Sequence, residues 1–449
     1  MIRGWCPSLF EPMRSGDGLL VRIKPRAGGL DADTLRAVAD ACARHGNGVA
    51  NLTGRANLQL RGLADVTLPP FADAMLALGA ADAHPAAERR RNLVVSPLVG
   101  DDPHLAPATL AVARALEAGL ADAAPTPLDA LPGKFGFLVD GGGACGLGPV
   151  RADIALRCTP DACLVRLDGG THALAVAPAD AAAAALALAR AFAALTPDTD
   201  TPDIQPRHAP RMRDLVLALG EAAVFAAAGL PAPRPAPPGP AAGQGADAPP
   251  AVGPLRYPGT TRGALAVAPA FGQTDAAALH ALAALSERFG DGRVRLSPSR
   301  TLLVAGVAAH DLPRLAAACA ALGLITAPDD PRLSVTTCPG RPACRSGEAD
   351  TRRDAPALAA LLAARADRPF ATIHLSGCAK GCAHPAPAPL TLVGEPGGYG
   401  ASRNARASAP PHARHASLDA AWAWAIATTP NPATPAFLPP AAPHPGTAP

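Results

Sequence analysis

The stretches LLVRIKP at 19–25 and ALAVAP at 264–269 are apolar and strand-like, and each opens one copy of a shared pattern. A gapless shift of the chain on itself aligns the two copies. It pairs Pro25 with Pro269, Asp31 with Asp275, Leu35 with Leu279, Gly46 with Gly290, Leu52 with Leu296, Leu58 with Leu302 and Gly62 with Gly306. Two Ala/Leu-rich helices would align by composition alone, but composition does not account for the matched prolines and glycines. We therefore predict an internal duplication.

Each copy has the pattern of a strand, an amphipathic helix and two further short strands. The helix is expected to begin at Asp31 in the first copy and at Thr274 and Asp275 in the second, and to end at Gly46 or Gly290. A larger segment follows each copy, so we predict an α+β fold with internal two-fold pseudosymmetry. The predicted boundaries are 9–70 and 255–322 for the copies, 86–228 and 331–430 for the larger segments, 229–254 for a Pro/Ala/Gly-rich linker and 431–449 for an irregular tail.

Charge and hydropathy exclude several classes of protein. A formal net charge of +3 with scattered basic residues does not fit a nucleic-acid binder that works by neutralising phosphates. The N-terminus lacks the apolar core of a secretory signal. The most apolar helical stretch, 181–195, contains Arg190 and falls short of the roughly 20 residues needed to span a bilayer. We expect a cytoplasmic protein.

Four of the ten cysteines carry the strongest chemical signal. They form CPGRPAC, with Cys338 and Cys344, and CAKGC, with Cys378 and Cys382. Four thiolates are the ligand set of a [4Fe–4S] cluster, and loops rich in Gly and Pro let backbone amides turn toward sulfur. Structural zinc is the alternative, but zinc sites favour ligand spacings of two to four residues. The pattern favours iron–sulfur and electron transfer.

The two copies differ in charge although they share one pattern. Arg22, Lys24, Arg55 and Arg61 in the first copy align with Ala266, Ala268, Ser299 and Ala305 in the second. Arg22 and Lys24 are two apart on a predicted strand and should share a face. These cations either cover a solvated surface or line an anion-binding groove between the copies.

Several motifs together resemble the sulfite/nitrite reductase superfamily. They are TGRANLQL at 53–60, RRRNLVVSP at 89–97, LPGKF at 131–135 and the cysteine quartet. The resemblance implies two ferredoxin-like half-domains and two larger α/β domains, with sirohaem, an iron tetrapyrrole with eight carboxylates, beside the cluster. It implies that Cys382 bridges cluster and haem, and that Arg55, Arg91 and Lys134 bind the tetrapyrrole and a small oxyanion.

One position departs from the sulfite reductases, which have a second lysine where this chain has Gly136. SGDGLLVRIKP at 15–25 and LPGKFGFLVDGGG at 131–143 look instead like the precorrin-3B synthase branch of the superfamily. That resemblance implies that precorrin-3A, itself an octacarboxylate, takes the place of sirohaem. It also implies hydroxylation at C20 with γ-lactone formation, using O2 and an electron donor, in aerobic cobalamin biosynthesis. Arg22 and Lys24 would then join the groove that binds the substrate.

This branch also implies a mononuclear non-haem iron. The sequence shows no clear ligand triad for it and no identifiable catalytic residue; His374 and His384 lie nearest the quartet. Precorrin-3B synthase is the first hypothesis. A sirohaem-dependent sulfite or nitrite reductase, and a non-enzymatic cluster or zinc protein, are the alternatives.

Overall fold

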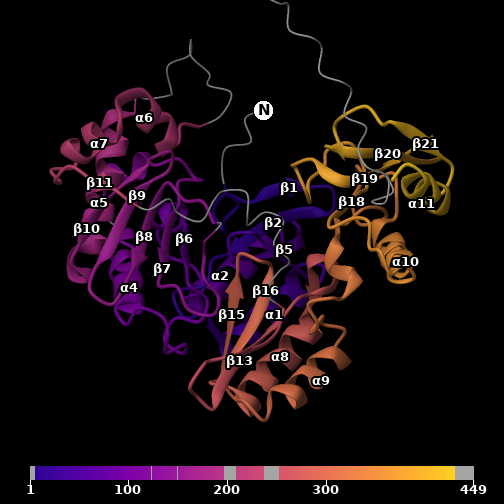
Figure 1. Ribbon diagram of the computed structural model, residues 1–449, viewed down its shortest axis with the longest axis horizontal. Helices are drawn as coiled ribbons and strands as arrows, with labels where there is room; N and C mark the ends of the chain where they lie inside the picture. The colour runs from indigo at the N-terminus through magenta and orange to yellow at the C-terminus, as the bar shows by residue number, and fades with distance from the viewer. Residues whose placement is uncertain (1–5, 123, 149, 197–208, 237–251, 430–449) are drawn as a thin grey trace, which may run out of the picture. The chain divides into compact units, whose positions relative to one another are not determined.

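The computed structural model (Figure 1) describes residues 6–122, 124–148, 150–196, 209–236 and 252–429. The chain divides into two compact units. The first unit comprises 1–336 and 342–345, and the second comprises 337–341 and 346–449.

The first copy of the duplication begins the first unit. Its elements are β1 (Met13–Ser15), β2 (Gly18–Ile23), β3 (Leu30–Asp31), α1 (Ala32–His45), β4 (Val49–Leu52), β5 (Leu58–Leu63) and α2 (Leu68–Ala77). The second copy repeats this order. Its elements are β12 (Gly253–Arg256), β13 (Arg262–Val267), β14 (Gln273–Asp275), α8 (Ala276–Phe289), β15 (Arg293–Ser297), β16 (Thr301–Ala308) and α9 (Leu312–Ala321).

The predicted helix boundaries are confirmed in both copies. The Asp31 carboxylate accepts from the Thr34 amide and the Asp275 carboxylate from the Ala278 amide, both at 2.8 Å, as N-cap residues do. Gly46 and Gly290 close the helices for a matching reason. A Cβ at Gly46 would lie 2.5 Å from the Arg61 carbonyl oxygen, and one at Gly290 would lie 2.4 Å from the Ala305 carbonyl oxygen.

The two copies complete each other's sheets. The first sheet has the order β1-β2-β5-β4-β14 and the second β12-β13-β16-β15-β3, so each ends on a strand from the other copy. Asp31 pairs with Arg293 in one sheet, and Asp275 pairs with Val49 in the other. This reciprocal exchange gives the two copies their pseudosymmetric arrangement.

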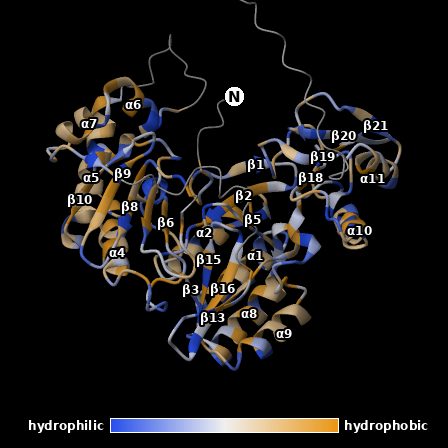
Figure 2. Ribbon diagram, in the orientation of Figure 1, coloured by the Kyte–Doolittle hydropathy of each residue, from blue (hydrophilic) through white to orange (hydrophobic). Residues whose placement is uncertain are grey.

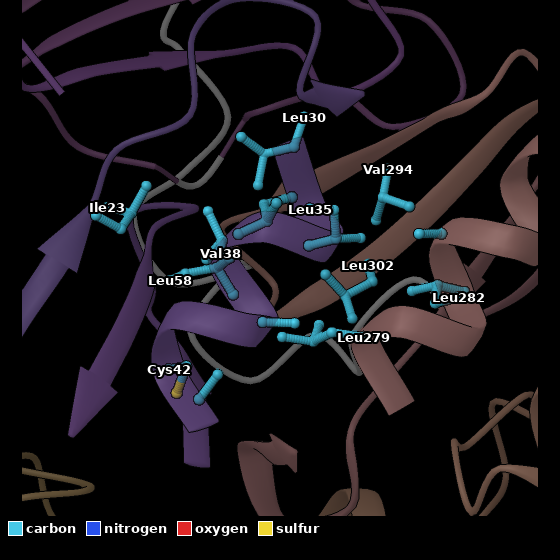
Figure 3. Close-up of a cluster of buried hydrophobic side chains, with 14 of the residues drawn as sticks. Ile23, Leu30, Leu35, Val38, Cys42, Leu58, Leu279, Leu282, Val294 and Leu302 are labelled. Atoms are coloured by element: carbon cyan, nitrogen blue, oxygen red, sulfur yellow. The ribbon is translucent and has the colours of Figure 1, made fainter. Parts of the chain in front are cut away.

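A single hydrophobic core joins the copies. Leu35 and Val38 on α1 and Leu279 and Leu282 on α8 are fully buried within one cluster. Figure 3 shows these side chains between the two helices, with strand residues such as Leu302 beside them. At about 1.5–3 kcal/mol for each large aliphatic side chain buried, this core makes the pair of copies one folding unit.

The first larger segment adds a sheet with the order β11-β10-β9-β8-β7-β6 to the same unit. Its elements are α3 (Pro85–Arg90), β6 (Leu93–Val95), α4 (Thr109–Leu120), a 3-10 turn (Pro127–Ala130), β7 (Phe137–Asp140), β8 (Ile154–Cys158), β9 (Cys163–Leu167), β10 (His172–Val176), α5 (Pro178–Leu195), α6 (Met212–Leu219), α7 (Glu221–Ala227) and β11 (Arg234–Pro235). Figure 2 shows the apolar character of strands β8, β9 and β10.

Helix α5 is longer than the apolar stretch identified in the sequence. Its 18 residues are enough to cross a membrane by length and composition alone. Its Leu188 and Phe192 are buried in one core with Leu156 of β8 and Val165 of β9. The apolar character of α5 is therefore explained by packing against its own sheet.

The second unit contains a mixed sheet. Its elements are α10 (Thr351–Ala363), β18 (Ile373–Ser376), β19 (Ala388–Glu395), β20 (Gly398–Ala405), β21 (Ala413–His415) and α11 (Leu418–Ala427), and β17 (Val335–Thr337) lies where the chain passes from one unit to the other. β18 pairs with β19 in parallel, whereas β19, β20 and β21 run antiparallel.

The predicted linker and tail fall largely outside the described residues. The linker, 229–254, is described only at 229–236 and 252–254, where β11 and the start of β12 are strands. The tail, 431–449, lies wholly outside the described residues.

Candidate anion site and cysteine loops

The loop between β4 and β5 holds Arg55 in a tight turn. The Thr53 amide donates to the Asn57 carbonyl at 3.1 Å, and the Thr53 hydroxyl accepts from the amides of Arg55 and Asn57. Ala56 adopts a left-handed conformation with φ of +55°, which few residues other than glycine adopt. The backbone around Arg55 is thus fixed by local hydrogen bonds.

The Arg55 guanidinium lies against the backbone of Gly136. A Cβ at Gly136 would lie only 2.6 Å from Arg55 Nη1. This nitrogen is buried and has no hydrogen-bond partner in the part of the chain that the structure describes. Burial lowers the pKa of Arg55, and the nearby charge of Arg211 lowers it further. A buried cationic donor without an acceptor is costly, so this arrangement favours an external anion.

Arg22 and Lys134 extend this cationic group. Arg22, on β2, donates to the Gln59 side chain at 3.1 Å and to the Cys6 sulfur at 3.3 Å. Lys134 lies in the loop that precedes β7. Burial lowers the pKa of Lys134, and the charge of Arg22, followed by those of Arg211 and Arg55, lowers it further. Three of the five predicted substrate-binding cations therefore share one electrostatic environment.

Lys24 and Arg91 lie elsewhere, in a buried ion network. Strand β2 ends at Ile23, so the alternation that would place Lys24 beside Arg22 stops before Lys24. Lys24 lies 3.7 Å from the Glu88 carboxylate, and Arg91 donates to Glu88 at 2.8 Å and to the Lys24 carbonyl at 2.7 Å. Arg91 also pairs with Asp82. With side chains only 4% and 2% exposed, Lys24 and Arg91 are engaged by the protein itself.

Arg211 is the cation that the sequence analysis missed. It lies immediately before α6 and pairs with the buried Asp153, with Nη2 at 2.6 Å from Oδ2. The available signal was the basic run RHAPRMR at 207–213, which follows a stretch without hydrophobic periodicity. Burial alone would lower the pKa of Arg211, but the hydrogen bonds and charge of Asp153, together with the charges of Asp168 and Asp214, raise it.

The cysteine loops of the second unit have the features expected around a thiolate ligand. The Gly377 amide donates to Cys338 Sγ at 3.2 Å. The Thr351 hydroxyl donates to the Cys338 carbonyl at 2.6 Å, and the Ser376 hydroxyl donates to the Cys378 carbonyl at 2.7 Å. Cys338 and Cys378 are half-buried, whereas Cys382 is exposed. An amide directed at sulfur is the contact that stabilises a charged cluster ligand.

Cys344 belongs to the first unit, where it contacts the turn between β1 and β2. A Cβ at Gly16 would lie 2.4 Å from Cys344 Sγ, and the Arg345 amide donates to the Gly16 carbonyl at 3.2 Å. Within the described residues, no three His, Cys, Asp or Glu side chains converge closely enough to hold a metal ion. The ligand role of the quartet therefore stays a prediction.

His374 on β18 is fully buried, and neither ring nitrogen has a partner among the described residues. Its ring lies 5.6 Å from that of His384. Burial, and then the charge of His384, lowers the pKa of His374 to about 4. His374 is therefore neutral at physiological pH.

Comparison with known proteins identifies the class to which this fold belongs. The family described as the nitrite/sulfite reductase ferredoxin-like half domain matches residues 11–78 and 258–322, which are the two duplicated copies. The structure of the Mycobacterium tuberculosis NirA protein shares the fold, with a TM-score of 0.60 and 20% identity over 84% of this chain and 71% of that chain. The predicted α+β fold with two ferredoxin-like half-domains is confirmed. The chain belongs to the nitrite/sulfite reductase family.

Within this family the chain is a homologue of precorrin-3B synthase. It is 35% identical to the precorrin-3B synthase of Sinorhizobium sp over 418 residues, 92% of this chain and 85% of the relative. It is also 26% identical to the ferredoxin–nitrite reductase of Synechococcus elongatus, over 87% of this chain and 78% of that enzyme. Relatives of both kinds make the chain an oxidoreductase by homology.

Proposed function

We propose that the chain is an O2-dependent monooxygenase that hydroxylates precorrin-3A at C20 and forms a γ-lactone from the ring A acetate, in aerobic cobalamin biosynthesis. One oxygen atom enters the substrate. The other leaves as water, with two electrons and two protons that an external donor such as NADH or a reductase supplies. Similarity to a precorrin-3B synthase over nearly the whole chain supports the choice. The observation that carries the proposal is the cationic group of Arg22, Arg55 and Lys134, in which a buried nitrogen of Arg55 has no acceptor among the described residues.

These cations suit a polycarboxylated macrocycle. Arginine pairs with carboxylates through two parallel hydrogen bonds, and lysine acts as a more mobile point charge. A substrate carboxylate beside Arg55 would supply an acceptor and offset the repulsion between cations that, together with burial, lowers the pKa of Lys134. The same interactions orient the ring so that C20 is held in place.

Lys24 and Arg91 have a different role in this proposal. Lys24 pairs with Glu88, and Arg91 pairs with Glu88 and Asp82. These buried ion pairs stabilise the segment between β2 and β6, and we do not place the two cations in contact with the substrate. Replacing either cation would then lower the stability of the fold, and it would affect substrate binding only indirectly.

Cys338, Cys344, Cys378 and Cys382 would hold the [4Fe–4S] cluster. The thiolate donor set and the Gly377 amide on Cys338 Sγ fit such a group. When bound, the cluster supplies electron transfer. The described residues bring together no triad of His and carboxylate ligands for a non-haem iron. Sirohaem belongs only to the alternative, a sulfite or nitrite reductase.

The deciding experiment supplies the anaerobically reconstituted protein with precorrin-3A, a reductant and isotopically labelled O2. Mass spectrometry should then find one labelled oxygen atom in the product. Failure to incorporate label, together with sulfite- or nitrite-dependent oxidation of a reduced dye and sirohaem bands in the visible spectrum, would reject the proposal in favour of the reductase.

A second experiment tests the binding group. Arg55→Ala should weaken tetrapyrrole binding by about ten- to a hundredfold, which is the usual contribution of one charged hydrogen-bonding group to affinity. Its iron content and cluster absorption should match those of the unaltered chain. Undiminished affinity would remove Arg55 from the site.

A further inference from the structure

Asp153 links two parts of the site through one buried carboxylate. It is fully buried and accepts hydrogen bonds from the Gly136 amide at 2.8 Å, from Arg211 Nε at 3.0 Å and Nη2 at 2.6 Å, and from the Met212 amide at 3.0 Å. The same carboxylate thus fixes Arg211 and the backbone of Gly136, against which the Arg55 guanidinium lies.

Arg211 influences more of the site than its ion-pair partner Asp153. Its charge acts on both Arg55 and Lys134, in the direction that opposes their protonation. Four neighbouring cations repel one another, Asp153 offsets part of this repulsion at Arg55, and a bound anion would offset more of it. The Arg211 side chain is 21% exposed, so an external ligand has access to it.

We propose that Arg211 is a fourth substrate-binding residue, which receives a carboxylate of the tetrapyrrole. Asp153 is the positioning residue that orients Arg211 and holds Gly136 where Arg55 needs it. This inference rests on the proposed function and adds a residue to its binding site. A planar guanidinium held on one edge by Asp153 is pre-oriented for a second carboxylate, so little conformational entropy is lost on binding.

The test is a fluorescence titration of the full-length chain with uroporphyrin III, a stable porphyrin that carries eight carboxylates. Arg211→Met should weaken binding by about ten- to a hundredfold, and Arg211→Lys should lie between Arg211→Met and the unaltered chain. Arg213→Ala is the matched control. Arg213 is two residues away, half-exposed, and its ion pair with Asp214 is long at 3.8 Å. Its loss should leave the affinity unchanged.

A double variant separates binding from structure. Arg211→Met alone leaves the Asp153 charge buried without its cation, which destabilises the protein. Asp153→Asn combined with Arg211→Met removes both charges and should restore thermal stability toward that of the unaltered chain. Asp153→Asn alone measures any loss of affinity that comes through the Gly136 amide. If Arg211 binds the ligand, the affinity of the double variant stays well below that of Asp153→Asn. If Arg211 serves only to neutralise Asp153, the two variants bind equally well, and the inference is overturned.

The outcomes also distinguish this inference from the proposed function. Equal affinity of the unaltered chain and the Arg211 variants would reject the role of Arg211 and leave the proposed function standing. A lack of uroporphyrin binding by the unaltered chain would reject a tetrapyrrole site altogether, and the Arg211 inference with it.

Discussion

Replacing Gly136 by alanine tests whether the Arg55 guanidinium must lie against the backbone at this position. The new methyl carbon would lie 2.6 Å from Arg55 Nη1 and 3.5 Å from both Arg55 Cζ and the Asn92 carbonyl oxygen. Favourable contacts between such atoms begin near 3.5 Å, so the guanidinium has to move by roughly 1 Å. No backbone atom lies closer than 3.5 Å to the new methyl carbon, so only the side chain of Arg55 has to move.

Stability and function should respond differently to this change. Overpacking a rigid core costs about 1–3 kcal/mol, but here the clash is with the end of a flexible side chain, and we expect a loss of under about 1 kcal/mol. A binding group misplaced by about 1 Å can cost about a hundredfold in turnover. Gly136→Ala should therefore unfold near the normal temperature yet show weakened uroporphyrin binding and slowed conversion of precorrin-3A.

Gly146→Ala is the control for this experiment, because a Cβ at the exposed Gly146 meets nothing closer than 4.0 Å. It should match the unaltered chain in unfolding temperature, binding and turnover. Unchanged turnover and binding in Gly136→Ala would refute the reasoning, since they would mean that the position of the Arg55 guanidinium does not matter. A large loss of stability would show instead that the clash spreads into the backbone.

Three further predictions concern the surroundings of the site. Glu88→Gln should lower the free energy of unfolding in urea by about 3–5 kcal/mol, because Lys24 and Arg91 lose a buried counter-ion; a loss below about 1 kcal/mol would contradict this. Burial raises the pKa of Asp17, but the hydrogen bond and charge of Arg61, together with the hydrogen bond of Ser15, bring the pKa below the ordinary 3.8. The pair stabilises the fold above that pH and ceases to do so as the pH falls through the lowered pKa, so Asp17→Asn should flatten the acid limb of the stability profile, and an unaltered limb would disprove it. Gly16→Ala would place a methyl carbon 2.4 Å from Cys344 Sγ and should reduce the iron bound after reconstitution; normal iron content would show that Cys344 tolerates the shift.

Local patterns alone were sufficient to predict the duplicated half-domains. Asp31 and Asp275 act as helix caps because their partners lie three residues along the chain. Gly46 and Gly290 were predicted as helix ends from punctuation alone. The exchange of β3 and β14 between the two sheets was not predictable in this way, because both strands are very short and their partners lie in the other copy, more than two hundred residues away.

The sequence by itself was enough to predict a chemistry for the chain, through the cysteine quartet and the motifs around Arg55, Arg91 and Lys134. Only the tertiary structure decided which cations act together. Lys24 and Arg91 pair with Glu88, whereas Arg211 pairs with Asp153 and its charge acts on Arg55 and Lys134. The physical reason is that a charge is engaged by whatever counter-ion the fold brings within hydrogen-bonding distance. Asp153 and Arg211 are 58 residues apart in the chain, and no local pattern connects them.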